Sequence, residues 1–363
     1  MKTLCIDARM MFHSGIGTYI RNLLPYLKEA FTALRVLAPI TFVDKWPDLA
    51  HFDLIPITAP LYSVQEQIRL PLNIPESDLF WTPHYNIPLP PIRAKKRIVT
   101  IHDVYHLVYG HTLSLPKRIY SQVMIRAAVR YSSLVITGSQ FSKNEIVKYA
   151  HALPDKVTVV HNGVNCGHFS SSPQSNVKEL YNLPENYFLF VSTLAPHKNL
   201  TRLLKAWNQV IGKYPDWSLV LAGKEVKNKE YLQVFDLFPN LRSRVRLLGE
   251  VKEQDLPALY ENGYAAISPS LYEGFGLPPL EAMAMGCPTV VSRAASHPEV
   301  CGEASLYIDP YDEEDIAQKI ILLIENESLR KTLSEKGTKR VELFTWKKTA
   351  EAHIDLMNGV VSS

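Results

Sequence analysis

SPSLYEGFGLPPLEAMAMGCPTVVS, residues 268–292, is the stretch that decides the fold. It follows the apolar run YAAIS and ends on PTVVS, two short β-branched runs of the kind that form buried strands. Between them a loop holds Gly274 and Gly276, and Pro278 and Pro279 preset the first turn of a helix that contains residues 280–285. Strand, helix and strand in this order predict a βαβ unit of a parallel sheet.

The same alternation runs along almost the whole chain. Expected strands are residues 3–7, 35–39, 78–82, 97–102, 134–139, 157–163, 187–193, 218–223, 245–250, 264–270, 288–292 and 305–310. Expected helices are residues 16–30, 117–132, 142–150, 200–211, 255–261 and much of the tail from residue 312. The polar stretch 166–177 interrupts the pattern and reads as a linker.

These patterns predict an α/β chain of two doubly wound, Rossmann-like parallel-sheet domains. The expected domains are residues 1–167 and 168–345, with a final helix, residues 346–363, packing back on the first domain. A length of 363 residues agrees with two domains at about 100 to 200 residues each.

Composition excludes several classes of protein. A net charge of +3, with 46% hydrophobic and 21% charged residues, is ordinary for a soluble globular chain and excludes collagen and disordered proteins. No run approaches the roughly 18 apolar residues of a membrane span, and Asp7 and Arg9 stand where a signal peptide would be apolar. We therefore expect a cytoplasmic protein. The four cysteines show no spacing typical of a disulfide framework or a zinc site.

The loop at residues 273–281 carries the strongest chemical signal. A glycine loop that opens a helix points backbone N–H groups and a positive dipole end at an anion, and a diphosphate fits that position. Glu273 and Glu281 would repel phosphate but suit the paired hydroxyls of ribose or a hexose. An anion flanked by polyols describes a nucleotide sugar. The structural alternative is a glycine turn with a glutamate favoured by the helix dipole.

EGFGLPPLE, residues 273–281, resembles the two-glutamate signature of the retaining glycosyltransferases of family 4, and the similarity extends over the whole chain. The resemblance implies the GT-B architecture, in which two Rossmann-like domains face each other across a cleft, with residues 1–167 binding the acceptor and residues 168–345 binding the nucleotide sugar. It also implies that Glu281 holds the ribose, that Glu273 and the backbone of residues 275–277 hold the sugar and phosphate, and that Lys198 contacts the diphosphate. His197 stands where the family commonly has arginine. The full set of donor-binding residues that the resemblance implies is Gly15, Gly17, Thr193, His197, Lys198, Gly223, Lys224, Val251, Glu273, Gly274, Phe275, Gly276, Leu277 and Glu281.

Catalytic residues by the same resemblance are His102, Asp103, Lys198 and Glu273, with His102 at a strand end where the family's histidine meets the donor sugar. His84 and Ser139 lie in loops that fit the acceptor side. Asp103 is the only acidic residue between Leu79 and Asn144, a segment with many basic residues. Arg118, Arg126 and Arg130 share one helical face, which suits an anionic lipid surface or a lipid diphosphate acceptor. A solvated basic face without a partner is the alternative.

The segments GFGLPPLEAMAMGCPTVVS and TLAPHKNL resemble bacterial mannosyltransferases of polysaccharide and O-antigen assembly. This resemblance favours transfer of mannose from GDP-mannose to a saccharide acceptor on a lipid carrier, with peripheral contact at the inner membrane surface. UDP-glucose, UDP-N-acetylglucosamine and GDP-fucose remain open as donors. Two other functions also remain open: a UDP-N-acetylglucosamine epimerase of similar fold, and a non-catalytic binding protein. We expect no metal, no cofactor and no nucleic-acid partner, since neither an Asp-x-Asp site nor a nucleic-acid motif is evident.

Overall fold

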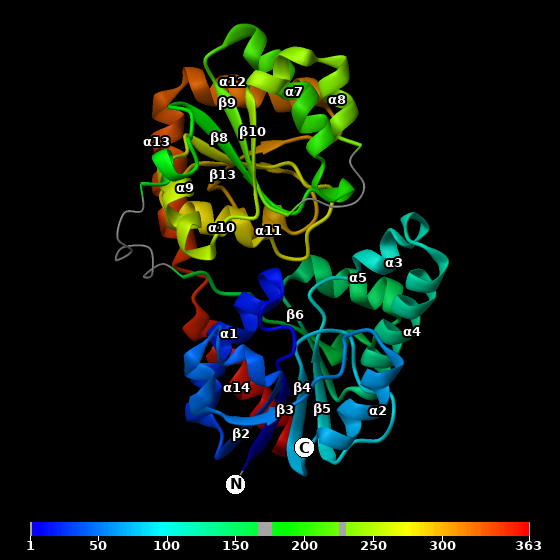
Figure 1. The fold of residues 1–363 in the computed structure, drawn as a ribbon. Helices are drawn as coiled ribbons and strands as arrows, with labels where there is room; N and C mark the ends of the chain where they lie inside the picture. The colour runs from blue at the N-terminus through cyan, green and yellow to red at the C-terminus, as the bar shows by residue number, and fades with distance from the viewer. Residues whose placement is uncertain (1, 166–175, 225–229, 363) are drawn as a thin grey trace. The chain divides into compact units, whose positions relative to one another are not determined.

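The computed structural model describes residues 2–165, 176–224 and 230–362. The chain divides into two compact units (Figure 1). Unit 1 comprises Met1–Gly163 and Trp346–Ser363, and unit 2 comprises Val164–Thr345. The expected boundary between residues 167 and 168 lies outside the described residues, as does most of the expected linker.

Unit 1 is built on a seven-stranded parallel sheet in the order β3-β2-β1-β4-β5-β6-β7, with helices on both faces. Its strands are β1 (Thr3–Asp7), β2 (Ala33–Ala38), β3 (Asp53–Pro56), β4 (Ser77–Thr82), β5 (Ala94–Thr100), β6 (Leu134–Thr137) and β7 (Val157–Val159). Its helices are α1 (Ser14–Ala30), α2 (Val64–Asn73), α3 (Tyr105–Val108), α4 (Leu115–Tyr131), α5 (Gln140–Ala150) and α14 (Trp346–Ser362). The chain order reverses beside β1, and such switch points are where open α/β sheets bind ligands.

Unit 2 has a six-stranded parallel sheet in the order β10-β9-β8-β11-β12-β13. The strands are β8 (Tyr187–Val191), β9 (Ser218–Ala222), β10 (Val245–Gly249), β11 (Ala265–Ser268), β12 (Thr289–Ser292) and β13 (Ser305–Ile308). The helices are α6 (Val177–Leu180), α7 (Leu200–Lys213), α8 (Leu232–Leu237), α9 (Leu256–Asn262), α10 (Leu277–Ala284), α11 (His297–Cys301), α12 (Glu313–Glu325) and α13 (Glu327–Val341). The doubly wound parallel sheets confirm the predicted fold class.

All twelve expected strands are present, but the sequence analysis missed β3 and the helices α2, α3, α6, α8 and α11. Proline accounts for two of these omissions: Pro56 ends β3, and Pro71 lies inside α2. Proline lowers the expectation of either element, yet β3 is an edge strand, where a missing N–H donor is tolerated. Ser63 caps α2 by accepting the N–H of Glu66 at 3.1 Å. This hydrogen bond offsets part of the free-energy cost of Pro71 inside the helix.

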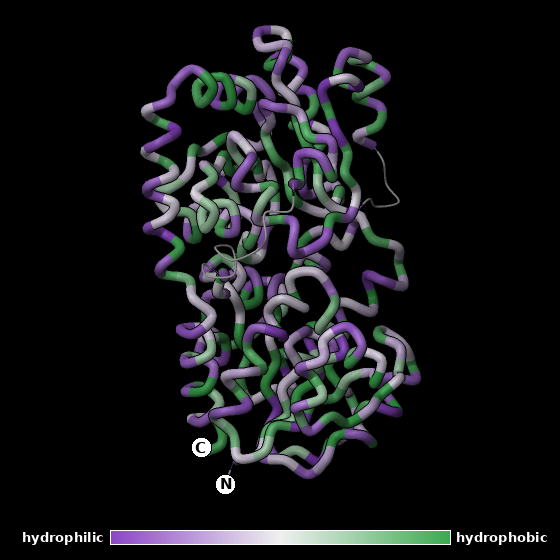
Figure 2. Tube along the Cα trace, turned by 60° about the vertical axis from the view of Figure 1, so that its left-hand side comes forward, coloured by the Kyte–Doolittle hydropathy of each residue, from purple (hydrophilic) through white to green (hydrophobic). Residues whose placement is uncertain are grey.

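Each unit has its own apolar core around its sheet, and hydrophilic and hydrophobic residues alternate along the outer helices (Figure 2). Helix α14 belongs to the core of unit 1, although it comes last in the chain. Its His353 accepts a hydrogen bond from the hydroxyl of Tyr19 on α1 at 2.5 Å, and both side chains are buried. Within the described residues, no helix combines the length and apolar character needed to cross a bilayer.

Candidate functional site

The parallel strands of unit 2 bring several predicted residues to one edge of the sheet. The chain leaves β8 at Ser192 and Thr193, and it leaves β9 at Gly223 and Lys224. Gly223 has φ 148°, and a Cβ there would lie 1.8 Å from the carbonyl oxygen of Ser192. Only glycine allows these two turns to approach so closely. The N–H of Leu194 then donates to the carbonyl of Lys224 at 3.1 Å, which joins the two loops.

The glycine loop opens α10 as the sequence predicted. Gly276 is the N-cap residue with φ 96°, and a Cβ at this position would meet the His297 ring at 3.1 Å. Pro278 and Pro279 follow in the first turn, where their missing N–H groups cost nothing. Glu281 lies in the second turn, because the helix begins at Leu277 and its first turn has no acidic residue. Of the first-turn residues Leu277 to Leu280, only the two leucines offer a backbone N–H, since proline has none.

Lys198 and Glu273 form an ion pair at this edge, with 2.7 Å between Nζ and Oε1. Their side chains are only 15% and 14% exposed. Burial by itself would raise the pKa of Glu273, but the Lys198 ammonium, the neighbouring His297 and the hydrogen bonds from Lys198 and Ser270 together outweigh it, and the pKa is lowered. Glu273 is therefore ionised at neutral pH. Residues 75 positions apart in the sequence thus present one cation and one anion side by side.

Sequence reasoning missed the residues that hold Glu273 in place. The Ser270 hydroxyl donates to its carboxylate at 2.8 Å, and the Ser296 hydroxyl lies 3.0 Å from its carbonyl and 2.8 Å from that of Phe275. His297 is fully buried beside Glu273 and bonds to the Ser292 hydroxyl at 2.8 Å. Burial lowers the pKa of His297 to about 4, so its ring is neutral. The AASHPEV segment that carries two of these residues contains no pattern that would single them out.

The second glutamate, Glu281, has a different partner. The hydroxyl of Tyr260 on α9 donates to its carboxylate at 3.1 Å. Burial raises the pKa of Glu281 to about 7, and the Tyr260 hydrogen bond lowers it only in part. Tyr260 was also missed from the sequence, because it lies 21 positions away in an unremarkable apolar helix. The two carboxylates of the signature therefore differ in charge at mildly acidic pH.

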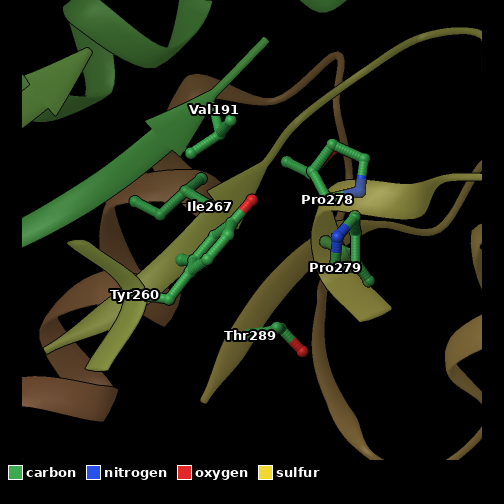
Figure 3. Close-up of a pocket in the computed structure, with 9 residues that line it drawn as sticks. Val191, Tyr260, Ile267, Pro278, Pro279 and Thr289 are labelled. Atoms are coloured by element: carbon green, nitrogen blue, oxygen red, sulfur yellow. The ribbon is translucent and has the colours of Figure 1, made fainter. Parts of the chain in front are cut away.

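A small cavity of about 10 Å³ lies between Tyr260 and the start of α10, with room for roughly one water molecule (Figure 3). Pro278 and Pro279 form one wall, and Val191 and Ile267 lie opposite. Ser268 also lines it, and its hydroxyl is 3.4 Å from Nε2 of His297. The cavity is therefore lined by Tyr260, which binds Glu281, and by Ser268, which lies beside His297.

The other predicted residues of unit 2 occupy the same edge with fewer contacts. Thr193 and Lys224 are exposed. His197 lies in the 3₁₀ turn Pro196–Lys198, and its carbonyl accepts the N–H of Leu271 at 2.8 Å, which ties this turn to the loop that precedes Glu273. Val251 packs with the apolar cluster that includes Tyr260.

Unit 1 carries the predicted catalytic histidine. His102 follows β5, and its Nε2 lies 3.0 Å from the carbonyl of Pro83 while its ring meets Tyr19 edge to face at 5.0 Å. Burial lowers its pKa, so the imidazole is neutral near pH 7. Asp103 accepts the N–H of Tyr105, the first residue of α3, at 2.9 Å. Gly15 and Gly17 lie in the first turn of α1, where a Cβ on Gly17 would lie 2.6 Å from the Met11 carbonyl.

The predicted acceptor-side residues fall into two environments. His84 is 9% exposed, and burial and the neighbouring His102 lower its pKa to about 3. Ser139 is buried and caps α5 by accepting the N–H of Ser142 at 3.0 Å. The three arginines of α4 at positions 118, 126 and 130 are all exposed. Ile119 and Val123 on the same helix are each 52% exposed.

In residues 2–165, 176–224 and 230–362, no three His, Cys, Asp or Glu side chains gather in a way that would hold a metal ion. The expectation that the site works without a metal or a cofactor stays a prediction.

Two family models match most of the chain. Residues 13–168 match the Glycosyltransferase Family 4 model, and residues 171–340 match the model described as glycosyl transferases group 1. The chain therefore belongs to this family of glycosyltransferases, and its two parallel-sheet units have the GT-B fold.

Individual relatives agree with this placement. The chain is 29% identical over 263 residues to the O-antigen chain mannosyltransferase B of Escherichia coli, an alignment that covers 70% of this chain and 68% of the relative. It is 28% identical over 362 residues to an uncharacterized glycosyltransferase of Methanocaldococcus jannaschii, covering 96% and 95% of the two chains. The crystal structure of Anabaena HepE in complex with UDP and glucose superposes with a TM-score of 0.81 at 19% identity, covering 99% and 100%.

Proposed function

We propose that this glycosyltransferase transfers a hexose, specifically mannose from GDP-mannose, to a hydroxyl of a saccharide acceptor with retention of the anomeric configuration. One observation carries the proposal: the Lys198–Glu273 pair and the Glu281 carboxylate lie around the glycine loop that opens α10. A cation, a helix N-terminus and two separate carboxylates match a diphosphate between two polyols. Mannose is favoured because the E. coli relative is a mannosyltransferase.

Each side chain has a distinct task in this proposal. Lys198 contacts the diphosphate, and since its ammonium has three donors it keeps Glu273 as a second partner. Glu273, ionised and fixed by Ser270, accepts hydrogen bonds from hexose hydroxyls. Glu281 accepts both hydroxyls of the ribose. Val251 contacts the base through its backbone, and His102 contacts the hexose.

The reaction needs charge stabilisation at the leaving group. As the bond between the anomeric carbon and the phosphate oxygen breaks, negative charge grows on the diphosphate, and Lys198 and the N-terminus of α10 stabilise it without a metal ion. The acceptor oxygen bonds to the anomeric carbon on the same face, and its proton passes to the departing phosphate oxygen. The neutral His102 is not required as a base in this scheme.

The acceptor in this proposal is attached to a lipid carrier. Helix α4 exposes arginines together with Ile119 and Val123, and this combination suits the headgroup region of an anionic membrane. The E. coli relative's name refers to an O-antigen chain. This helix would then bring the enzyme to the membrane surface from the cytoplasm.

Calorimetric titration with GDP and with UDP tests the choice of donor. GDP should bind more tightly, whereas tighter UDP binding would reverse the assignment. Incubation with GDP-mannose and a labelled manno-oligosaccharide should give an α-linked product by NMR. A β-linked product would exclude retention. Conversion of UDP-N-acetylglucosamine without any acceptor would instead identify an epimerase.

A further inference from the structure

The residue that follows Lys198 has an unusual backbone conformation. Asn199 is the N-cap residue of α7, and its φ of 63° and ψ of 30° lie in the left-handed region, which costs free energy for any residue except glycine. An N-cap asparagine ordinarily has an extended backbone, and its side chain accepts an N–H of its own helix. Asn199 makes no such bond, although its side chain is only 3% exposed. Its conformation therefore serves something other than the start of α7.

The Asn199 side chain joins three loops at the carboxyl edge of the unit 2 sheet. Its own segment follows β8. Its amide nitrogen donates to the carbonyl of Pro269, just after β11, at 3.1 Å, and to the carbonyl of Pro310, just after β13, at 2.7 Å. The amide oxygen accepts a hydrogen bond from Arg202 at 3.1 Å. The whole amide group is therefore engaged, and it holds the turn that carries Lys198 against two other strand ends.

These bonds also lead to Glu273. The carbonyl of Pro269 belongs to the peptide that continues into Ser270, and the Ser270 hydroxyl donates to Oε1 of Glu273 at 2.8 Å. The same carboxylate oxygen accepts the Lys198 ammonium at 2.7 Å. Contacts and covalent bonds therefore run in a closed ring from Lys198 through Glu273, Ser270, Pro269 and Asn199 back to Lys198. Within this ring the position of the ammonium is fixed from both ends of the lysine.

The conformation and the bonds together explain why this residue is an asparagine. Glycine would adopt φ 63° freely, but it has no amide to bind the two carbonyls. Aspartate also tolerates the left-handed region, yet its carboxylate has no N–H donors and would face two carbonyl oxygens. Asparagine combines a tolerated backbone with two donors on a short side chain. Strained residues of this kind are concentrated at ligand sites, where the surrounding structure enforces the geometry.

We propose that Asn199 is a positioning residue for Lys198, which fixes the turn of the lysine so that the ammonium is already in place for the donor diphosphate. This inference rests on the proposed function, from which it takes the contact between Lys198 and the diphosphate. Asn199 acts through the lysine, because its amide binds protein carbonyls. A charge that is placed in advance needs no reorganisation when the diphosphate binds or departs. Without the amide, the lysine must be ordered during binding, and affinity is lost.

A double-mutant cycle on nucleotide affinity in the full-length chain tests the inference. Asn199→Gly keeps the left-handed backbone without strain and removes the amide. This variant should fold, because the N–H of Leu271 still donates to the carbonyl of His197 and joins the turn to the same loop; circular dichroism checks this. By calorimetry, its Kd for GDP should rise about fivefold, and its Kd for UDP by the same factor, since both ligands contain the diphosphate. In the Lys198→Ala background the same change should alter either Kd less than about twofold.

Two further variants separate positioning from general stability. Asn199→Asp keeps the size of the side chain and tolerates the backbone, but it cannot donate to the two carbonyls. It should therefore raise the Kd at least as much as Asn199→Gly. Asn182→Gly is the matched control: Asn182 is an exposed asparagine of the same unit with φ 46°. Removal of its side chain should leave nucleotide affinity unchanged.

The possible outcomes distinguish the inference from the proposed function. An unchanged Kd in Asn199→Gly, while Lys198→Ala weakens nucleotide binding, would overturn the inference alone. An equal loss in both backgrounds, or the same loss in Asn182→Gly, would also overturn it, because Asn199 would then act independently of the lysine. An unchanged Kd in Lys198→Ala would remove the lysine from the nucleotide site and contradict both. If the cycle gives the expected factors but the wild type transfers no sugar from any nucleotide sugar, the proposed function fails and the inference stands.

Discussion

At the scale of single residues, the site depends on two carboxylates in unlike surroundings. Glu273 is held ionised by Lys198, whereas burial raises the pKa of Glu281 to about 7. The same residue type is therefore ionised at one position and titrates near neutral pH at the other. The signature EGFGLPPLE predicts both positions, but only the structure shows that their partners are Lys198 and Tyr260.

Lys198→Ala should lower kcat by about a hundredfold or more, because it removes a cation placed where charge develops on the diphosphate. Folding should be normal by circular dichroism. Lys205→Ala is the matched control, since Lys205 pairs with Glu313 on the same unit at greater exposure. Wild-type turnover in Lys198→Ala would remove this lysine from the mechanism.

The affinity for GDP should rise between about pH 6 and pH 8, because the Glu281 pKa of about 7 leaves the carboxyl protonated at the lower pH. Only the ionised form accepts hydrogen bonds from both ribose hydroxyls. Calorimetry over this range should show a weaker dependence of GDP affinity on pH for Glu281→Gln than for the wild type. Any pH dependence that remains in this variant comes from other groups, such as the nucleotide phosphates, and can be subtracted. Tyr260→Phe should move the transition to higher pH, since the tyrosine hydrogen bond lowers the pKa of Glu281. Identical profiles in wild type and Glu281→Gln would contradict the assignment.

At the scale of elements, the start of α10 depends on a glycine, Gly276, that lies against the His297 ring of α11. Gly276→Ala should destabilise unit 2 by about 1 to 3 kcal/mol, because the new Cβ meets His297 and the backbone lies at φ 96°. Denaturant unfolding measures this change. Gly212→Ala is the control: Gly212 is helical with nothing near its Cβ position, so this variant should be neutral or more stable. Equal stability of the two variants would show that the loop tolerates a side chain.

Helix α4 makes a second prediction at this scale. Reversing the charges of Arg126 and Arg130 to glutamate should abolish flotation with anionic vesicles at low salt. The same change at Lys331 and Lys339, two exposed residues of α13, alters the net charge equally and should have no effect. If both double variants lose vesicle binding to the same degree, the attraction follows net charge rather than α4.

The sequence predicts elements best where apolar runs are unbroken. Every expected strand exists, and the glycine loop and its helix lie where predicted. Because Pro56 and Pro71 interrupt the patterns of β3 and α2, the sequence did not predict these two elements. The loop before α2 was missed with them. Ser296 and His297 were missed for another reason: Ser296 contacts Glu273 and His297 contacts Ser268, both more than 20 positions away, and no local sequence pattern records such contacts.

At the scale of the whole molecule, the last helix of the chain belongs to the first unit. Met357 on α14 is fully buried in the core of unit 1, so Met357→Ala should cost about 2 to 5 kcal/mol. Hydrogen exchange should show protection lost in β1 and β4 but kept in β8 to β13. Asp355→Ala, on the exposed side of the same helix, is the control. Equal loss of protection in both sheets would mean that the two units unfold as one.

The central claim is that the loop of residues 273–281 holds a nucleotide sugar. A crystal structure of the full chain with GDP-mannose tests it most directly. The account predicts both ribose hydroxyls within hydrogen-bonding distance of Glu281 and a diphosphate oxygen beside the Lys198 ammonium. A nucleotide bound elsewhere, with Glu281 bonded only to Tyr260, would contradict it.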